Sequence, residues 1–342
     1  MKFKPHILRN KTIMQTNKYV YILISNNNDL YYQQALISIY SLRTHSPYAH
    51  ITVLCDNDTA NSLKDDRDEI KQYITELKII EIPQNYNTAK QKSRWLKTSI
   101  REHISGNMLF IDCDTIITEN IDSVFNLNID LGAVYDLHTT LDKYPLGKSI
   151  FERAKMLGYS LENELEYFNS GVLLIKDNEK VHSFFKKWHK NWIDSCKQGL
   201  DFDQPTFAKT NIETGHLIKP LDDIYNCQLK YGAKALGNAK IIHYFNFSQP
   251  HEPYAFMNNS LLEQMKGKSL QDCIIFKYMQ DPKSAFIEPT MIVGMKDLQF
   301  IYSPIYILFK QNADYSKFSY LFLLTACRLI NKINKIIGKK AI

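Results

Sequence analysis

Short apolar runs that end in polar segments alternate with helical patterns in the N-terminal part of the chain. The runs at 19–24, 51–55 and 78–82 are typical of buried strands. Apolar side chains recur at helical spacing over 31–42, and a polar helical stretch precedes the third run. This order predicts an α/β fold, with a mostly parallel sheet and helices on both of its faces.

The alternation continues as far as residue 243. It predicts helices over 88–104 and 179–192 and strands over 108–112, 132–135, 171–175 and 239–243. Ligands of open α/β sheets bind beyond the carboxyl ends of the strands. The residues after each strand are therefore candidate site residues, and Ser25, after the first strand, is expected to contact a substrate.

The composition is that of a folded globular protein. Of 342 residues, 44% are hydrophobic and 23% are charged, which suits one large domain with an appendage. The six cysteines are scattered and form no CxxC pair, so neither a zinc site nor a disulfide framework is predicted. The chain has no secretory signal and no run of about 18 apolar residues, and we expect a cytoplasmic location.

The positive charge is concentrated at the C-terminus. The net charge is +6, and six Lys and Arg residues follow Asp314 with no acidic residue among them. The rest of the chain is close to neutral, so no nucleic-acid partner is expected. Apolar and basic residues repeat on separate faces over 318–337, which predicts a basic amphipathic helix. Such a helix can pack against the body, but charge of one sign favours an anionic membrane surface.

Two acidic residues directly follow a predicted strand. The carboxylates of Asp112 and Asp114, one residue apart, can bind one Mn²⁺ or Mg²⁺ ion and the phosphate oxygens that it bridges. Two acids beside a turn are often only solvated, but the apolar segments on both sides favour a metal site. His243 ends another predicted strand and is a candidate third ligand, although a lone His there is more often structural.

Two polar clusters are candidates for contacts with a sugar. Asn169 and Ser170 come directly before a predicted strand, and their side chains offer donors and acceptors for hydroxyl groups. Asp203 and Gln204 come before a proline turn. A tight turn and a solvent-facing loop are the structural alternatives for these two clusters.

The helix predicted before Asp112 carries cations. Arg94 and Lys97 lie on one helical face, as do Lys97 and Arg101. Such a face can bind a diphosphate, or it can be ordinary surface charge.

Together these segments resemble glycosyltransferase family eight, the retaining galactosyl- and glucosyltransferases with a GT-A fold. The matching segments, in the family's order, are the strand and D-x-D at 108–114, the N-[AS]-G-V signature at 168–175, the Asp-Gln pair at 203–204 and the metal-binding His at 243. Residues 131–136 are similar to the strand that brings an acidic residue, here Asp136, towards the donor sugar. The resemblance covers roughly residues 17–250.

The resemblance implies a GT-A domain at 17–255, with a Rossmann-like sheet, and a C-terminal extension at 256–342 that ends in the basic helix. It implies a retaining hexosyltransferase that uses a UDP-hexose donor and a metal held by Asp112, Asp114 and His243. The expected acceptor is a saccharide or a glycolipid in cell-surface polysaccharide synthesis, at the inner face of the membrane.

The resemblance also assigns roles to the remaining candidates. Gln204 and Asp203 are the expected catalytic residues beside the sugar. The expected substrate-binding residues are Asn169, Ser170, Asp136, Lys97, Arg94 and Ser25.

The sequence departs from the family's pattern near the phosphates. The family continues after its His with a Gly and Lys-Pro-Trp, whose Lys contacts the diphosphate, but the run 243–250 contains no Lys. Lys97 stands where the family has an Arg. Phosphate binding is therefore expected to be rearranged.

Two other functions fit part of the pattern. A phosphatase of the haloacid dehalogenase type has D-x-D-x-T, but Ile116 stands here at the place of that Thr. A membrane-docked sugar-binding protein with a dead site is the alternative that is not an enzyme, and the near-complete set of motifs argues against it.

Overall fold

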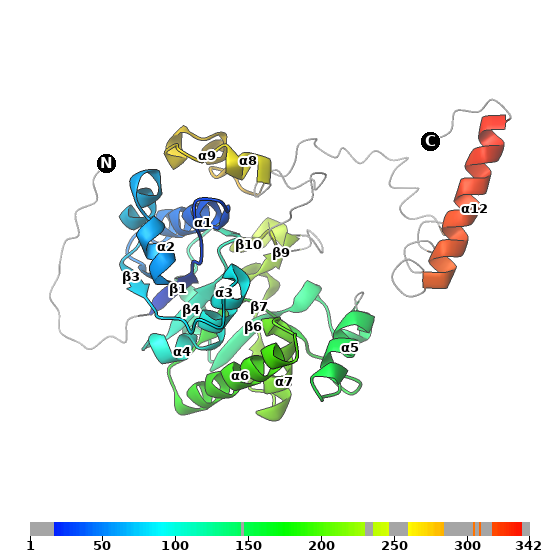
Figure 1. Cartoon of the computed structure of the whole chain (residues 1–342), viewed down its shortest axis with the longest axis horizontal. Coiled ribbons are helices and arrows are strands. Elements are labelled where there is room, and N and C mark those ends of the chain that lie inside the picture. Colours follow the sequence, from blue (N-terminus) through cyan, green and yellow to red (C-terminus); the bar gives the residue numbers. More distant parts are fainter. Residues whose placement is uncertain are drawn as a thin grey trace.

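A seven-stranded sheet lies at the centre of the fold (Figure 1). The structure is a computed structural model that describes residues 17–144, 147–229, 235–245, 259–283, 304, 308 and 317–336. Among these residues the order across the sheet is β3 (Glu76–Ile79), β2 (His50–Cys55), β1 (Lys18–Ile22), β4 (Met108–Ile111), β7 (Phe168–Ile175), β6 (Leu131–Tyr135) and β8 (Ile218–Pro220). Only β7 runs antiparallel to its neighbours among these strands. The predicted α/β fold with a mostly parallel sheet is confirmed.

Helices cover both faces of this sheet (Figure 1). The α-helices around it are α1 (Tyr31–His45), α2 (Asn57–Ser62), α3 (Ala89–Thr98), α4 (Ile100–His103), α5 (Gly147–Met156), α6 (Glu179–Lys197) and α7 (Asp203–Glu213). Short 3-10 helices join them: η1 (Asp65–Gln72), η2 (Asp122–Asn126), η3 (Asp136–His138), η4 (Leu141–Lys143), η5 (Asp223–Tyr225) and η7 (Leu236–Asn238).

Strand β1 shows why the strands have continuous apolar runs in the sequence. Tyr19 and Tyr21 enter the core that the sheet shares with α1, whereas Val20 and Ile22 enter the core shared with α3, α4 and α6. Successive side chains of a strand point to opposite faces, so a strand that is covered on both faces needs apolar residues at every position.

A small second sheet adjoins the large one. It consists of β5 (Thr115–Ile117), β10 (Ile241–His243) and β9 (Cys227–Gln228), in the order β5-β10-β9. β10 is antiparallel to β5, with His243 opposite Thr115, and parallel to β9. Because β5 starts just after β4 ends, the chain crosses from one sheet to the other over residues 112–114.

Three local predictions need correction. The helix expected over 88–104 is broken at Ser99 into α3 and α4. Asn169 and Ser170 lie inside strand β7 and not directly before it, so the alternative of a tight turn is wrong as well. Asp203 and Gln204 begin helix α7, which continues through Pro205, so the expected proline turn is wrong. Asp203 is buried, which excludes the alternative of a solvent-facing loop.

Part of the predicted C-terminal extension shares the core of the body. α8 (Asn259–Glu263), η8 (Leu270–Asp272) and α9 (Ile274–Tyr278) contribute Leu262, Leu270 and Ile275, which are fully buried in the core on the α1 side. The backbone N–H of Gly267 donates to Asp66 and that of Leu270 to Glu69, at 3.1 and 3.0 Å, so the segment is also hydrogen-bonded to η1. The boundary predicted at 255 and 256 lies outside the described residues.

The basic tail forms helix α12 (Lys317–Ile336). Its apolar side chains remain exposed, with exposed fractions of 67% for Phe322, 59% for Leu329 and 48% for Ile333. The part of the chain that the structure describes therefore does not cover this apolar stripe. Within that part, no helix is both long enough and apolar enough to cross a membrane. All six cysteines are free thiols.

The packing of α6 against α7 leads to a test of the fold. Trp188 is fully buried beside Phe184 and Phe207, and its indole N–H donates to the Asp203 carbonyl and to Thr206 Oγ1. We expect Trp188→Ala to lower the free energy of unfolding by about 3–5 kcal/mol, because it leaves a cavity in the core. Urea unfolding measures this change. Tyr48→Ala, at a fully exposed position, should change it by less than about 0.5 kcal/mol; equal effects of both substitutions would contradict the packing.

Candidate active site

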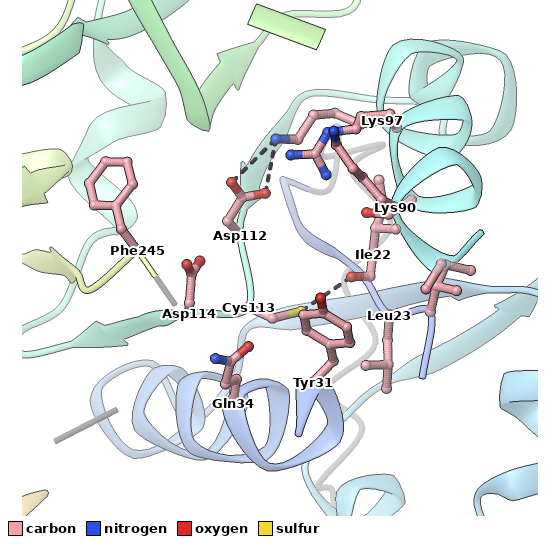
Figure 2. A pocket seen from close by; sticks show the side chains of 14 residues that line it. Ile22, Leu23, Tyr31, Gln34, Lys90, Lys97, Asp112, Cys113, Asp114 and Phe245 are labelled. Atoms are coloured by element: carbon pink, nitrogen blue, oxygen red, sulfur yellow. Dashed lines mark hydrogen bonds and ion pairs between the residues drawn. The ribbon is translucent and has the colours of Figure 1, made fainter. Parts of the chain in front are cut away.

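The crossing between the two sheets positions the two acidic residues. The backbone N–H of Asp112 donates to the Gly171 carbonyl at 2.8 Å, which fixes the end of β4 against β7. The thiol of Cys113 donates to the Ile22 carbonyl, so this side chain points towards β1. Figure 2 shows Asp112 and Asp114 along this crossing segment, with both carboxylates towards the pocket.

His243 completes a cluster with these carboxylates. Its Nε2 atom lies 3.2 Å from Oδ1 of Asp114, and its ring is buried. Burial disfavours the charged imidazole, but the adjacent Asp114 raises the pKa of His243 above its ordinary value. One ligand atom from each of Asp112, Asp114 and His243 lies within 4.8 Å of the others. Two carboxylates and an imidazole are suitable ligands for a divalent cation, so the residues fit the predicted metal.

The cluster requires a glycine at position 171. A Cβ atom there would lie 2.4 Å from Cε1 of His243 and 2.9 Å from Oδ2 of Asp112. Real Cβ atoms do not approach other heavy atoms this closely, so any other residue would displace the side chains of the cluster. The packing of the cluster thus explains why a glycine stands at this position.

Helix α3 forms a cationic wall beside the cluster. The Nζ atom of Lys97 lies 3.0 Å from Oδ1 of Asp112 and 3.3 Å from Oδ2 of Asp203, and Arg94 Nε lies 3.1 Å from Oδ1 of Asp203. Burial opposes the charge on Asp203, but Lys97 and Arg94 hold its pKa far below the ordinary value. Arg101, on the other hand, bonds to the Gly106 carbonyl at the opposite end of the helices and is not part of this wall.

The remaining predicted residues form a hydrogen-bonded network next to the cluster. Ser170 donates to Oδ2 of Asp203 at 2.8 Å, and Asn169 donates to Oδ1 of Asp136 at 2.9 Å. Burial raises the pKa of Asp136 above its ordinary value. The side chain of Gln204 acts against that burial by favouring the charged form of the Asp136 carboxyl group. The structure thus connects the two polar clusters of the sequence through the bond between Ser170 and Asp203.

A pocket of about 500 Å³ opens in front of the cluster (Figure 2). It is lined by Ile22, Leu23, Ile24, Tyr31, Gln34, Ala89, Lys90, Ser93, Arg94, Lys97, Asp112, Cys113, Asp114 and Phe245. Ser25 is not among the lining residues. Its hydroxyl donates to Asp29 and accepts a hydrogen bond from Arg67, which places it in the loop that leads to Tyr31.

Sequence reasoning missed four residues of this site. Lys90 lies one turn before Arg94 on the same helix, so its helical spacing could have identified it. Phe245 stacks on His243 with ring centres 4.1 Å apart, and Tyr31 lines the pocket from the first turn of α1. Asn226 contacts His243, but it is a lone Asn beside a two-residue strand, and no sequence signal points to it.

Comparisons with known proteins identify one matching family and several similar solved structures. Residues 22–250 match the family described as glycosyl transferase family 8. None of the curated proteins matches the sequence. Mouse xyloside xylosyltransferase 1 is a similar solved structure, with 15% identity, coverage of 67% of this chain and 97% of that chain, and a TM-score of 0.46. Glycosyltransferase GlyE of Streptococcus pneumoniae TIGR4 has 18% identity, coverage of 79% of this chain and 65% of that chain, and a TM-score of 0.45. Galactosyltransferase LgtC with donor and acceptor sugar analogs has 13% identity, coverage of 81% and 98%, and a TM-score of 0.46.

The close packing at Gly171 leads to a test of the cluster. We expect Gly171→Ala to fold but to weaken Mn²⁺ binding by about 10-fold or more, because the added methyl group displaces His243 and Asp112. Isothermal titration calorimetry with Mn²⁺ measures the affinity. Gly237→Ala is the matched control, since a Cβ atom there meets nothing within 4 Å. Unchanged affinity in a folded Gly171→Ala variant would show that these side chains do not bind the metal.

Proposed function

The chain belongs to glycosyl transferase family 8, and on this premise we propose that it transfers a hexose from a UDP-hexose to a saccharide or glycolipid acceptor, with retention of configuration. Family membership makes it a glycosyltransferase and removes the phosphatase alternative. The observation that carries the finer proposal is the cluster of Asp112, Asp114 and His243, which faces a pocket with a cationic wall.

Asp112, Asp114 and His243 would hold Mn²⁺ or Mg²⁺. When bound, the ion would neutralise the diphosphate and stabilise it as a leaving group. The buried His243 imidazole favours Mn²⁺, because Mg²⁺ is usually bound by oxygen atoms alone.

The cations of α3 would bind the phosphates. Lys90, Arg94 and Lys97 line the pocket at spacings of four and three residues, so all three reach it from one helical face. Lys90 is the most accessible of them; it pairs with Asp201 at 2.6 Å, and its ammonium group lies over the Phe202 ring. These residues would replace the phosphate-binding Lys that the family has shortly after its His. In this chain the first Lys after His243 is Lys266.

The apolar end of the pocket would bind the nucleoside. Ile22, Leu23 and Ile24 line it beside Tyr31, whose side chain is 42% exposed and can stack on a base. Ser25 would contribute by holding the loop before Tyr31, through its bonds to Asp29 and Arg67.

The network around Asp136 would bind the sugar. Asn169, Ser170 and Gln204 offer amide and hydroxyl groups there. Asp203 is ion-paired with Lys97 and Arg94, which makes it a poor nucleophile and leaves it a supporting role beside the sugar. We therefore expect the acceptor hydroxyl to attack the anomeric carbon on the face of the leaving group. The bond to the phosphate oxygen breaks as the new bond forms, and that oxygen takes the proton of the hydroxyl.

Replacing the carboxylates tests this proposal. We expect Asp112→Asn and Asp114→Asn each to lower Mn²⁺-dependent turnover by about 100-fold or more, because the stabilisation of leaving-group charge is lost. Release of UDP from a panel of UDP-hexoses measures turnover. Asp58→Asn, an exposed acid outside the pocket, should turn over like the wild type. Turnover that is unchanged in both site variants would refute the proposal, and a wild type that turns over none of the donors would favour a binding protein without catalysis.

The tail helix would dock the enzyme on the cytoplasmic face of the membrane, a position that would suit a lipid-linked acceptor in surface polysaccharide synthesis. Phe322, Leu329 and Ile333 remain exposed on α12, as do Arg328 and Lys332. An exposed apolar stripe together with cations is suited to the interface of an anionic bilayer.

Vesicle binding tests the role of the tail. We expect truncation after Asp314 to abolish binding to anionic vesicles without removing UDP-hexose binding. Arg328→Gln combined with Lys332→Gln should weaken vesicle binding about 30-fold, since each basic residue contributes about 1 kcal/mol. Salt should also weaken it, because charges are screened over about 10 Å at 0.1 M. Co-sedimentation measures binding, with neutral vesicles as the control. A full-length protein that ignores anionic vesicles at low salt would exclude membrane docking.

A further inference from the structure

A chain of three hydrogen bonds connects the candidate metal ligand to the candidate sugar site. Nδ1 of His243 lies 2.9 Å from Oδ1 of Asn226. Nδ2 of Asn226 donates to Oδ1 of Asn169 at 2.9 Å, and Nδ2 of Asn169 donates to Oδ1 of Asp136 at 2.9 Å. All four side chains are buried, with Asn226 completely enclosed, so water cannot readily replace any link.

The direction of these hydrogen bonds is fixed by the backbone. The N–H of Gly171 donates to Oδ1 of Asn169 at 2.9 Å, so an oxygen must stand at that position. The amide nitrogen of Asn169 then faces the carboxyl group of Asp136. Because Oδ1 of Asn169 is an acceptor, Asn226 must present its own amide nitrogen to it, and its oxygen therefore faces His243.

An oxygen beside Nδ1 decides which nitrogen of His243 is free for a ligand. Nδ1 must carry a proton to meet the acceptor, so in the neutral ring the lone pair is on Nε2. Nε2 is the atom that faces Asp114, at 3.2 Å. Metal-bound histidines commonly donate their other N–H to such a partner, which fixes the orientation and the tautomer of the ring.

We propose that Asn226 is a positioning residue that sets the metal-binding tautomer of His243 and, through Asn169, ties this ligand to Asp136. The proposal rests on the proposed metal site. It adds a residue that does not line the pocket and that contacts the cluster through the His243 ring. It also means that His243, the proposed metal ligand, and Asp136, the proposed sugar-binding carboxyl group, are held in place by the same hydrogen bonds.

The strand that follows Asn226 supports the same arrangement. Gln228 is fully buried in β9; its Oε1 accepts the N–H of Leu137, and its Nε2 donates to the Tyr135 carbonyl, both at 2.8 Å. Leu137 has a φ of 56°, an unusual backbone conformation for this residue, directly after Asp136. Residues 226 and 228 therefore hold both ends of the hydrogen-bonded chain, the His243 ring and the turn at Asp136.

Mn²⁺ affinity, measured from the electron paramagnetic resonance signal of the free ion, tests the role of Asn226. Asn226→Leu removes the acceptor for Nδ1–H, and we expect it to weaken Mn²⁺ binding by about 10- to 100-fold. Asn226→Asp keeps an acceptor oxygen for Nδ1–H but loses the N–H that donates to Oδ1 of Asn169, so we expect a loss that is at least about 3-fold smaller than that in Asn226→Leu. Asn211→Leu is the matched control and should bind Mn²⁺ like the wild type, because Asn211 is a buried Asn on α7 whose side-chain oxygen accepts the backbone N–H of Ile218.

The outcomes separate this inference from the metal site itself. If His243→Ala binds Mn²⁺ as tightly as the wild type, the proposed metal site is wrong. If His243→Ala weakens binding but Asn226→Leu does not, the metal site stands and the role of Asn226 is refuted. A loss in Asn226→Asp as large as that in Asn226→Leu also refutes it. Should thermal unfolding show that Asn226→Leu does not fold, Asn226→Ala takes its place with the same expected loss.

Discussion

The site depends on bringing three carboxylates close together in a largely buried place. Asp112, Asp114 and Asp203 would repel one another there without positive partners. Lys97 bridges Asp112 and Asp203, and His243 lies against Asp114. Burial still raises the pKa of Asp112, although Lys97 opposes that shift. A divalent ion at Asp112 and Asp114 would supply the charge that these side chains offset only in part.

The fold meets this requirement by joining two sheets at one point. Strand β4 of the large sheet ends at Ile111, and strand β5 of the small sheet begins at Thr115. Asp112 and Asp114 therefore occupy the segment that crosses from one sheet to the other. β10 returns beside β5 and brings His243 opposite Thr115 from a distant part of the sequence. Gly171 on β7 leaves the space in which these side chains meet. Helix α3 places the cations Arg94 and Lys97 beside Asp112 and Asp203.

Much of this could be predicted from the sequence, because strands covered on both faces leave continuous apolar runs and their polar ends mark the site. The candidate metal ligands Asp112, Asp114 and His243 were predicted in this way. Asn169, Ser170 and the Asp203–Gln204 pair were predicted as polar clusters whose roles the family resemblance implies. What could not be predicted depends on contacts between distant segments. The direction in which Ser25 points depends on Arg67, and the role of Asn226 depends on three residues of other strands and turns. The break at Ser99 in the predicted helix likewise leaves no clear mark in the sequence.

The central claim is that Asp112, Asp114 and His243 bind one divalent ion together. Diffraction at the manganese absorption edge, from crystals grown with Mn²⁺ and UDP, tests it most directly. The account predicts a single strong anomalous peak about 2 Å from a carboxylate oxygen of each Asp and from Nε2 of His243. A strong peak bound by other residues, or no peak at this cluster with saturating Mn²⁺, would contradict it.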